Sequence, residues 1–189
     1  MDVTPELVRA AQDGDPAAME ELIAGSYRAV YTLALRLMRN PDDAAEATQE
    51  AYIRMVRSLK RFREVGAFPT WMFKIVSNVC MTEMKKRSKR DVPISTEAMV
   101  DPSPADAESD AVGRVFWEEL EGSVRRLPEV YRSVVVLRDI YGMSGEETGD
   151  VLGISPGAVK VRLHRARKRL RDELAGQFPE WAGDERETA

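Results

Sequence analysis

The sequence has few of the residues from which metal sites and catalytic sites are usually built. It contains a single cysteine, Cys80, and a single histidine, His164. One cysteine cannot form an intramolecular disulfide, and these two residues cannot supply a Cys/His zinc cluster. The chain also has no glycine-rich phosphate loop. We therefore expect no catalytic residue, no bound metal, no cofactor and no small-molecule substrate.

Long apolar runs are missing as well. No stretch approaches the roughly 18 apolar residues of a membrane span. The N-terminal stretch MDVTPELVRAAQDGD carries acidic residues and has no apolar block, unlike a signal peptide. We therefore expect a cytoplasmic chain that does not enter a membrane. Signals for β-strands are almost absent, and 189 residues suffice for one large domain or two small ones.

Charge is distributed unevenly along the chain. The formal net charge of −4 argues by itself against binding to a polyanion. Residues 61–90, however, hold eight Lys or Arg against two Asp or Glu, and residues 156–171 hold seven Lys or Arg and no acid. The segment between them, residues 91–113, holds six acids and no base. Each basic segment is therefore a candidate surface for nucleic acid.

Helix signals dominate the first half of the chain. Capping residues stand directly before prolines at Thr4-Pro5 and Asp15-Pro16, which is typical of helix starts, and the helical pattern restarts after Asn40-Pro41. Apolar residues at three-and-four spacing predict a helix from Pro16 to about Met38 and another after Pro41. Thr70 is expected to cap a further helix, TWMFKIVSNVCMTEMKKRSK, that continues to about Lys89.

The second half contains a helix-turn-helix pattern. Ser144 and Glu147 form a capping box, Gly153 suits the left-handed turn at a helix end, and Ser155 with Pro156 begins a second, strongly basic helix. Small Gly149 is expected where the two helices approach closely. The preceding run Val134–Val136 is expected to be helical, because no partner strand exists for it.

These patterns predict an all-α fold with two small helical domains joined by a flexible acidic linker. The C-terminal domain is the helix-turn-helix. The linker, DVPISTEAMVDPSPADAESD and the residues just after it, has three prolines and no helical period. The expected boundaries are residues 1–90 for the first domain, 91–113 for the linker, 114–175 for the second domain and 176–189 for a C-terminal tail.

Two helices carry surfaces suited to DNA. In the last helix, Val159, Leu163, Ala166 and Leu170 share an apolar face, and the basic residues occupy the other faces, as in a recognition helix. In the helix after Thr70, cationic and amide side chains lie beside aromatic rings, which suits single-stranded DNA. A solvated basic helix remains open for the first surface, and a purely structural role remains open for the ring of Trp71.

Three motifs carry a resemblance to a known family. DAAEATQEAYIRMVRSLKRF and GAFPTWMFKIVSNVCMTEMKKR resemble the second conserved region of the extracytoplasmic-function (ECF) sigma factors of bacterial RNA polymerase, group IV of the housekeeping-type sigma superfamily. SGEETGDVLGISPGAVKVRLHRARKRLRDEL resembles their fourth region. The resemblance implies an alternative sigma factor, which binds core polymerase and recognises a promoter to initiate transcription.

The resemblance also implies roles for individual residues. Contacts to the clamp of the largest polymerase subunit fall on Asp43, Glu46, Gln49 and Glu50. Contacts to the melted minus-ten strand are implied for a second set of residues, Arg61, Arg63, Trp71, Lys74, Asn78, Lys85, Lys86 and Arg87. Contacts to the minus-thirty-five DNA are implied for a third set, Ser155, Lys160, Arg162, His164, Arg165, Arg167, Lys168 and Arg171. The implied partners are core RNA polymerase at its clamp and flap regions, promoter DNA and an anti-sigma factor.

Four positions depart from the family pattern. Ala158 and Val161 stand where Thr and Ser are usual, Thr148 replaces an apolar residue, and Gly149 replaces Ala. These departures concern promoter specificity rather than the overall role. Other classes of protein stay open at this point: a conventional helix-turn-helix regulator that binds duplex DNA without polymerase, and a helical adaptor for acidic proteins. An enzyme is a weaker alternative, because so few catalytic residue types are present.

Overall fold

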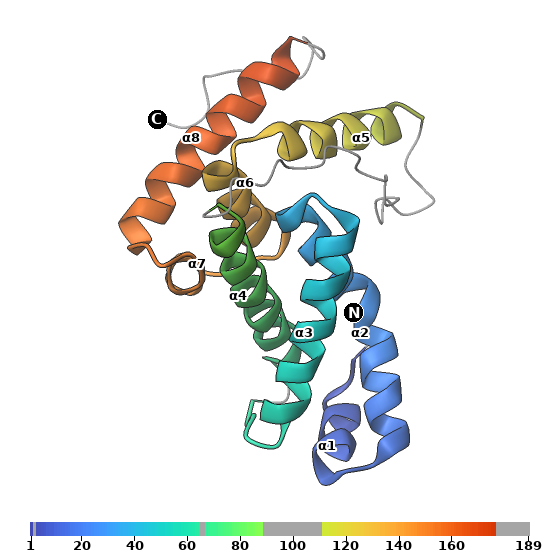
Figure 1. Ribbon diagram of the computed structural model, residues 1–189. Helices are drawn as coiled ribbons and strands as arrows, with labels where there is room; N and C mark the ends of the chain where they lie inside the picture. Colours follow the sequence, from blue (N-terminus) through green and yellow to red (C-terminus); the bar gives the residue numbers. More distant parts are fainter. Residues whose placement is uncertain (2, 65–66, 89–110, 177–189) are drawn as a thin grey trace. The chain divides into compact units, whose positions relative to one another are not determined.

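The computed structural model describes residues 1, 3–64, 67–88 and 111–176 of the chain. Every regular element in these ranges is a helix, so the all-α prediction is confirmed (Figure 1). None of these helices combines the length and the apolar character that a membrane crossing requires. Most of the expected linker and of the tail, with Lys89 and Arg90, lies outside the described residues.

The described residues form two compact units. The first contains helices α1 to α4, and the second contains α5, α6, η2, α8 and the start of α7. Helix α5 begins at Ala111, three residues before the expected start of the second domain.

The first three helices begin at the proline signals. They span Pro5–Asp13 (α1), Pro16–Met38 (α2) and Pro41–Leu59 (α3). The side chains of Thr4, Asp15 and Asn40 accept hydrogen bonds from backbone N–H groups two or three residues ahead, at 3.2, 2.9 and 3.0 Å. These bonds satisfy donors that have no partner inside the helix, so the capping predictions for Thr4 and Asp15 are confirmed, and Asn40 caps α3 in the same way.

Helix α4 spans Phe68–Ser88 and therefore begins before Thr70, so the prediction that Thr70 caps it is wrong. The cause lies in the side chain of Phe68, which is fully buried. Its ring lies 6.3 Å from the ring of Phe62 and 5.9 Å from that of Trp71. Burying this ring stabilises helical backbone two residues upstream of the polar signal.

Helix α3 packs against both α2 and α4. Its contact stripe begins with three alanines, Ala44, Ala47 and Ala51, and none of them is more than 1% exposed. Alanine side chains let helices approach closely, and the larger Met55 fills the space further along the stripe. Helix α1 is joined to the end of α3 by Gln12, whose Nε2 donates to the carbonyl oxygen of Leu59 at 2.9 Å.

The second unit is built from α5 (Ala111–Arg126), α6 (Glu129–Val135), the π-helical turn η2 (Val136–Ile140), α8 (Pro156–Ala175) and the first residues, up to Gly149, of α7 (Gly145–Leu152). The valine run is helical, as predicted, and its side chains are buried. Helix α8 contacts both α5 and α6. Arg126 of α5 also donates to Glu173 of α8 at 2.6 Å.

The helix-turn-helix pattern is confirmed in detail. The backbone N–H of Ser144 donates to the Glu147 carboxylate at 2.8 Å, and the N–H of Glu147 donates to the Ser144 hydroxyl at 3.1 Å. Gly153 has a φ of 67°, which glycine adopts without a steric penalty. The Ser155 hydroxyl accepts from the N–H of Ala158 at 3.2 Å and caps α8.

Gly149 lies at the closest approach in this motif. A Cβ atom added there would lie 2.7 Å from the carbonyl oxygen of Ile154, which is backbone and cannot swing aside. The N–H of Ile154 donates to the carbonyl oxygen of Gly149 at 3.0 Å, so the turn is held against α7. The absence of a side chain at this position is therefore a condition of the tight turn.

Gly149→Ala should destabilise the motif by about 1–3 kcal/mol, because the overlap with Ile154 outweighs the better helix propensity of alanine. Gly145→Ala is the matched control, since nothing lies within 4 Å of its added Cβ. That change should stabilise α7 by up to about 1 kcal/mol. Amide hydrogen exchange of α8 measures both effects, and equal protection in the two variants would contradict the steric explanation.

Candidate nucleic-acid and partner interfaces

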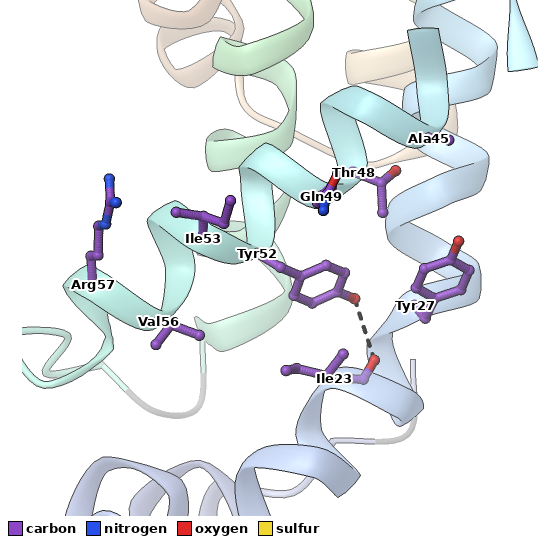
Figure 2. Close-up of a pocket in the computed structure, with 9 residues that line it drawn as sticks. All are labelled: Ile23, Tyr27, Ala45, Thr48, Gln49, Tyr52, Ile53, Val56 and Arg57. Carbon is purple, nitrogen blue, oxygen red and sulfur yellow. Dashed lines mark hydrogen bonds between the residues drawn. The ribbon is translucent and has the colours of Figure 1, made fainter. Parts of the chain in front are cut away.

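Helix α3 presents two grooves on either side of its buried stripe. The first, called here the α2–α3 groove, has a volume of about 510 Å³. It is lined by Ile23, Tyr27, Ala45, Thr48, Gln49, Tyr52, Ile53, Val56 and Arg57, as Figure 2 shows. Most of these side chains are apolar or aromatic, so the groove suits an apolar partner surface with a few polar contacts.

The floor of the α2–α3 groove is held by Tyr52. Its hydroxyl lies 2.8 Å from the hydroxyl of Ser26. It also donates to the carbonyl oxygen of Ile23 at 3.3 Å, as Figure 2 shows. Its ring stacks with that of Tyr27, at a centroid distance of 6.4 Å. Burial raises the pKa of the Tyr52 phenol. These contacts fix the spacing between α2 and α3.

The rim of the same groove exposes apolar side chains. Tyr27 is 48% exposed, Ile53 is 40% exposed and Val56 is 45% exposed. A neighbouring group of exposed apolar side chains often marks an interaction surface. Sequence reasoning missed these residues, because Ile53 and Val56 follow the spacing of a buried helix face.

The residues expected to contact the clamp do not share one face. Gln49 lines the α2–α3 groove, whereas Asp43, Glu46 and Glu50 line a second, charged groove of about 620 Å³ between α3 and α4. Glu50 accepts from Arg54 at 2.7 Å. The expected set therefore spans two sides of α3.

Asp43 forms an ion pair with Arg87 of α4. Arg87 was expected to hold DNA, and it also lines the α3–α4 groove. Lys86 donates to Glu83 at 2.7 Å. The basic end of α4 is thus partly neutralised by acids of its own unit, which leaves fewer cations fully available to a phosphate backbone.

The other residues expected at the minus-ten strand differ in exposure. Arg61, Arg63, Asn78 and Lys85 are exposed, whereas Lys74 and Trp71 are half-buried. The Trp71 ring stacks on Phe62 with centroids 4.4 Å apart. This packing favours the structural role for Trp71 that the sequence left open. Asn78 and Lys85, seven residues apart, lie on one face of α4.

Helix α8 has the predicted division of faces. Val159, Leu163, Ala166 and Leu170 are buried. The side chains of Lys160, His164, Arg165, Arg167, Lys168 and Arg171 are exposed, and Arg162 is half-buried. A cationic surface beside the N-terminal half of such a helix is what phosphate and base-edge contacts require.

Two arginines of α8 are tied to their own unit. Arg167 donates to both carboxylate oxygens of Asp139, at 3.0 and 2.6 Å, and these bonds raise the pKa of its guanidinium. The guanidinium of Arg169 lies 5.1 Å from the centre of the Tyr131 ring. Both contacts connect α8 to the α6–η2 segment, and sequence reasoning identified neither.

Both basic segments lie in regions that match family models. Residues 22–90 match Sigma-70 region 2, and residues 117–170 match Sigma-70 region 4. The chain is 36% identical over 181 residues to the ECF RNA polymerase sigma factor SigE of Mycolicibacterium smegmatis, which covers 89% of this chain and 67% of that protein. It is 33% identical over 182 residues to ECF RNA polymerase sigma factor ShbA of Streptomyces griseus, covering 87% of this chain and 92% of that protein.

This chain belongs to the ECF sigma factor family. Two solved structures share its fold. The sigma factor RpoE of Bartonella quintana, in complex with the anti-sigma factor NepR, has a TM-score of 0.61 at 22% identity, over 82% of this chain and 95% of that one. CnrH, in complex with the cytosolic domain of CnrY, has a TM-score of 0.57 at 24% identity, over 91% of this chain and 97% of that one.

The sigma factor has one cysteine inside its first unit. Cys80 is fully buried on α4, and burial raises the pKa of its thiol to about 12. Among the described residues, no three His, Cys, Asp or Glu side chains are placed to hold a metal ion.

The native sigma factor should therefore react very slowly with a thiol reagent at pH 8. A thiol with a pKa of about 12 is almost entirely protonated at that pH, and it is also shielded from the reagent. Unfolding in urea should restore the ordinary rate. Mass spectrometry of alkylated protein measures both states, and rapid native labelling of Cys80 would show that α4 opens easily.

Proposed function

We propose that this sigma factor acts through three separate surfaces on core RNA polymerase and promoter DNA. The α2–α3 groove binds the clamp of the largest subunit, one face of α4 binds the melted minus-ten strand, and α8 binds the minus-thirty-five duplex. The main support is that an uncovered apolar groove and two cationic helices occur in one chain, inside the ranges that match regions 2 and 4. The protein works in the cytoplasm and has no catalytic activity of its own.

The clamp contact centres on the α2–α3 groove. Exposed Ile53 and Val56 supply apolar area, and Gln49 supplies an amide beside them. Asp43, Glu46 and Glu50 extend the contact around α3 with negative charge, which complements arginines on the clamp. An apolar centre with a polar rim is the usual composition of a stable interface.

Ile53→Asp and Val56→Asp should each weaken binding to core polymerase on the order of tenfold or more, because each places a charge in the apolar centre of the contact. Ala17→Asp is the matched control. It also adds one exposed carboxylate, but in the first turn of α2 and outside the groove. Fluorescence anisotropy with labelled protein measures the affinity. Equal losses in all three variants would assign the effect to charge alone.

The minus-ten surface centres on Asn78 and Lys85 of α4. An exposed amide can form hydrogen bonds with an unstacked base, and an exposed ammonium can pair with a phosphate. Arg61 and Arg63, just after α3, add positive charge. The border of the proposed surface is formed by side chains that also contact other residues of the first unit. These are Lys74, Lys86, Arg87 and the ring of Trp71.

Lys85→Ala should reduce holoenzyme binding to a minus-ten oligonucleotide more than Lys86→Ala does, because Lys86 already pairs with Glu83. The slope of log affinity against log salt should fall by roughly 0.7 for Lys85→Ala, the value of one released phosphate contact on a single strand. Lys86→Ala should change the slope less. Competition binding at several salt concentrations measures the slopes. A larger loss of affinity in Lys86→Ala than in Lys85→Ala would show that the ion pair with Glu83 does not limit the contact of Lys86 with DNA.

The minus-thirty-five surface is the exposed face of α8. It comprises Lys160, Arg162, His164, Arg165, Arg167, Lys168 and Arg171, with the capped N-terminus at Ser155. The domain boundaries proposed for this arrangement are residues 1–90 and 114–175, joined by the acidic linker 91–113 and followed by the tail 176–189. Joining the two DNA-binding units on one polymerase raises their effective concentration.

Regulation by an anti-sigma factor is part of the proposal. Two solved structures with this fold contain a bound partner, the anti-sigma factor NepR in one and the cytosolic domain of CnrY in the other. A partner that covers the α2–α3 groove would block the clamp contact directly. The flap region of the polymerase is the proposed second contact, made by the second unit.

Promoter-dependent transcription tests the function as a whole. Core polymerase with this sigma factor should initiate from a specific promoter, and core polymerase alone should not. A chain that binds a duplex operator specifically without core polymerase, and that fails to bind core polymerase, would instead be a conventional helix-turn-helix regulator.

A further inference from the structure

Val161 occupies an unusual position on α8. Its side chain is 50% exposed. It follows the buried Val159 by two residues, which is a rotation of about 200° around the helix, so it points away from the core. Among the described residues of α8, it is the one large apolar side chain that is exposed. Packing within the second unit therefore does not explain a valine here.

Helix propensity does not explain it either. Valine is β-branched and forms exposed helix less readily than alanine, lysine or arginine, all of which occur elsewhere in α8. A docking surface for another protein would need several apolar neighbours. Val161 instead has exposed Lys160, His164 and Arg165 around it. The surroundings are those of a surface that meets a polyanion.

Val161 also lies where base edges are read. It is in the second turn of α8, which begins at Pro156. The N-terminal residues of a recognition helix contact base edges, while cations beside them bind phosphates. Ala158, one turn earlier, is half-buried and adds a second methyl group on the same side. Helix α8 has no Ser, Thr or Tyr, and the hydroxyl of Ser155 just before it is engaged as the helix cap.

The chemistry of the major groove narrows what Val161 can recognise. Its side chain has no hydrogen-bond donor or acceptor, so it cannot read the polar edges of guanine, adenine or cytosine. Thymine alone carries an apolar group in the major groove, the methyl at C5. We propose that Val161 is a specificity-determining residue that contacts the 5-methyl group of one thymine in the minus-thirty-five element. This assignment rests on the proposed minus-thirty-five function of α8.

The experiment uses the holoenzyme formed with core polymerase. A promoter library randomised across the minus-thirty-five element is first selected for binding. Each thymine of the selected element, on either strand, is then replaced singly by deoxyuridine, which removes only the methyl group. One replacement should lower wild-type affinity about fourfold, the value of one buried methyl-sized group. The same replacement should have no effect with Val161→Ala. This variant should remain folded, because alanine forms helices more readily than valine.

Val130→Ala is the matched control, since Val130 is 47% exposed but lies on α6. This variant should keep the full sensitivity to deoxyuridine. A selected element without thymine, no sensitive position in the wild type, or unchanged sensitivity in Val161→Ala would overturn the assignment. A failure of the underlying function appears earlier and differently: the wild-type holoenzyme would select no promoter sequence at all, before any deoxyuridine is introduced.

Discussion

The close packing of α3 between α2 and α4 is the constraint on which the first unit depends. Ala44, Ala47 and Ala51 form the start of the buried stripe, and their small side chains bring three helices together. The buried stripe of α3 packs against α2 and α4. The residues of α3 on either side of this stripe line the two grooves. One is apolar and the other is charged. The hydroxyl contact between Tyr52 and Ser26 then holds the apolar groove at a fixed width.

In both units, an acid of the same unit pairs with one of the arginines that are proposed to bind DNA. Asp43 pairs with Arg87 in the first unit, and Asp139 binds Arg167 in the second. Arg167 is exposed, and pairs at the surface contribute little to stability, whereas Asp43 and Arg87 are both half-buried. A paired arginine gains less from a phosphate, so the proposed DNA binding depends more on the exposed lysines and on contacts with bases. Weak charge attraction combined with specific contacts suits a protein that polymerase delivers to DNA.

Local signals in the sequence predicted most of the fold. Proline and capping residues placed the starts of α2, α3 and α8, and the Ser144–Glu147 box placed α7. The start of α4 was misplaced, because burial of Phe68 outweighs the polar signal at Thr70. The exposed rim of Ile53 and Val56 could not be predicted, since helical periodicity does not say which apolar face stays uncovered. Ion pairs between helices, such as Asp43 with Arg87, depend on tertiary packing that no local pattern encodes.

Site-specific photocrosslinking tests the central claim most directly. A photoreactive amino acid replaces Ile53 in the α2–α3 groove, or Ala17 outside it, and each protein is irradiated with core polymerase. The account predicts an adduct with the largest subunit from position 53 and none from position 17. An adduct from position 17 alone, or none from position 53 although the holoenzyme forms, would show that polymerase binds another face of this sigma factor.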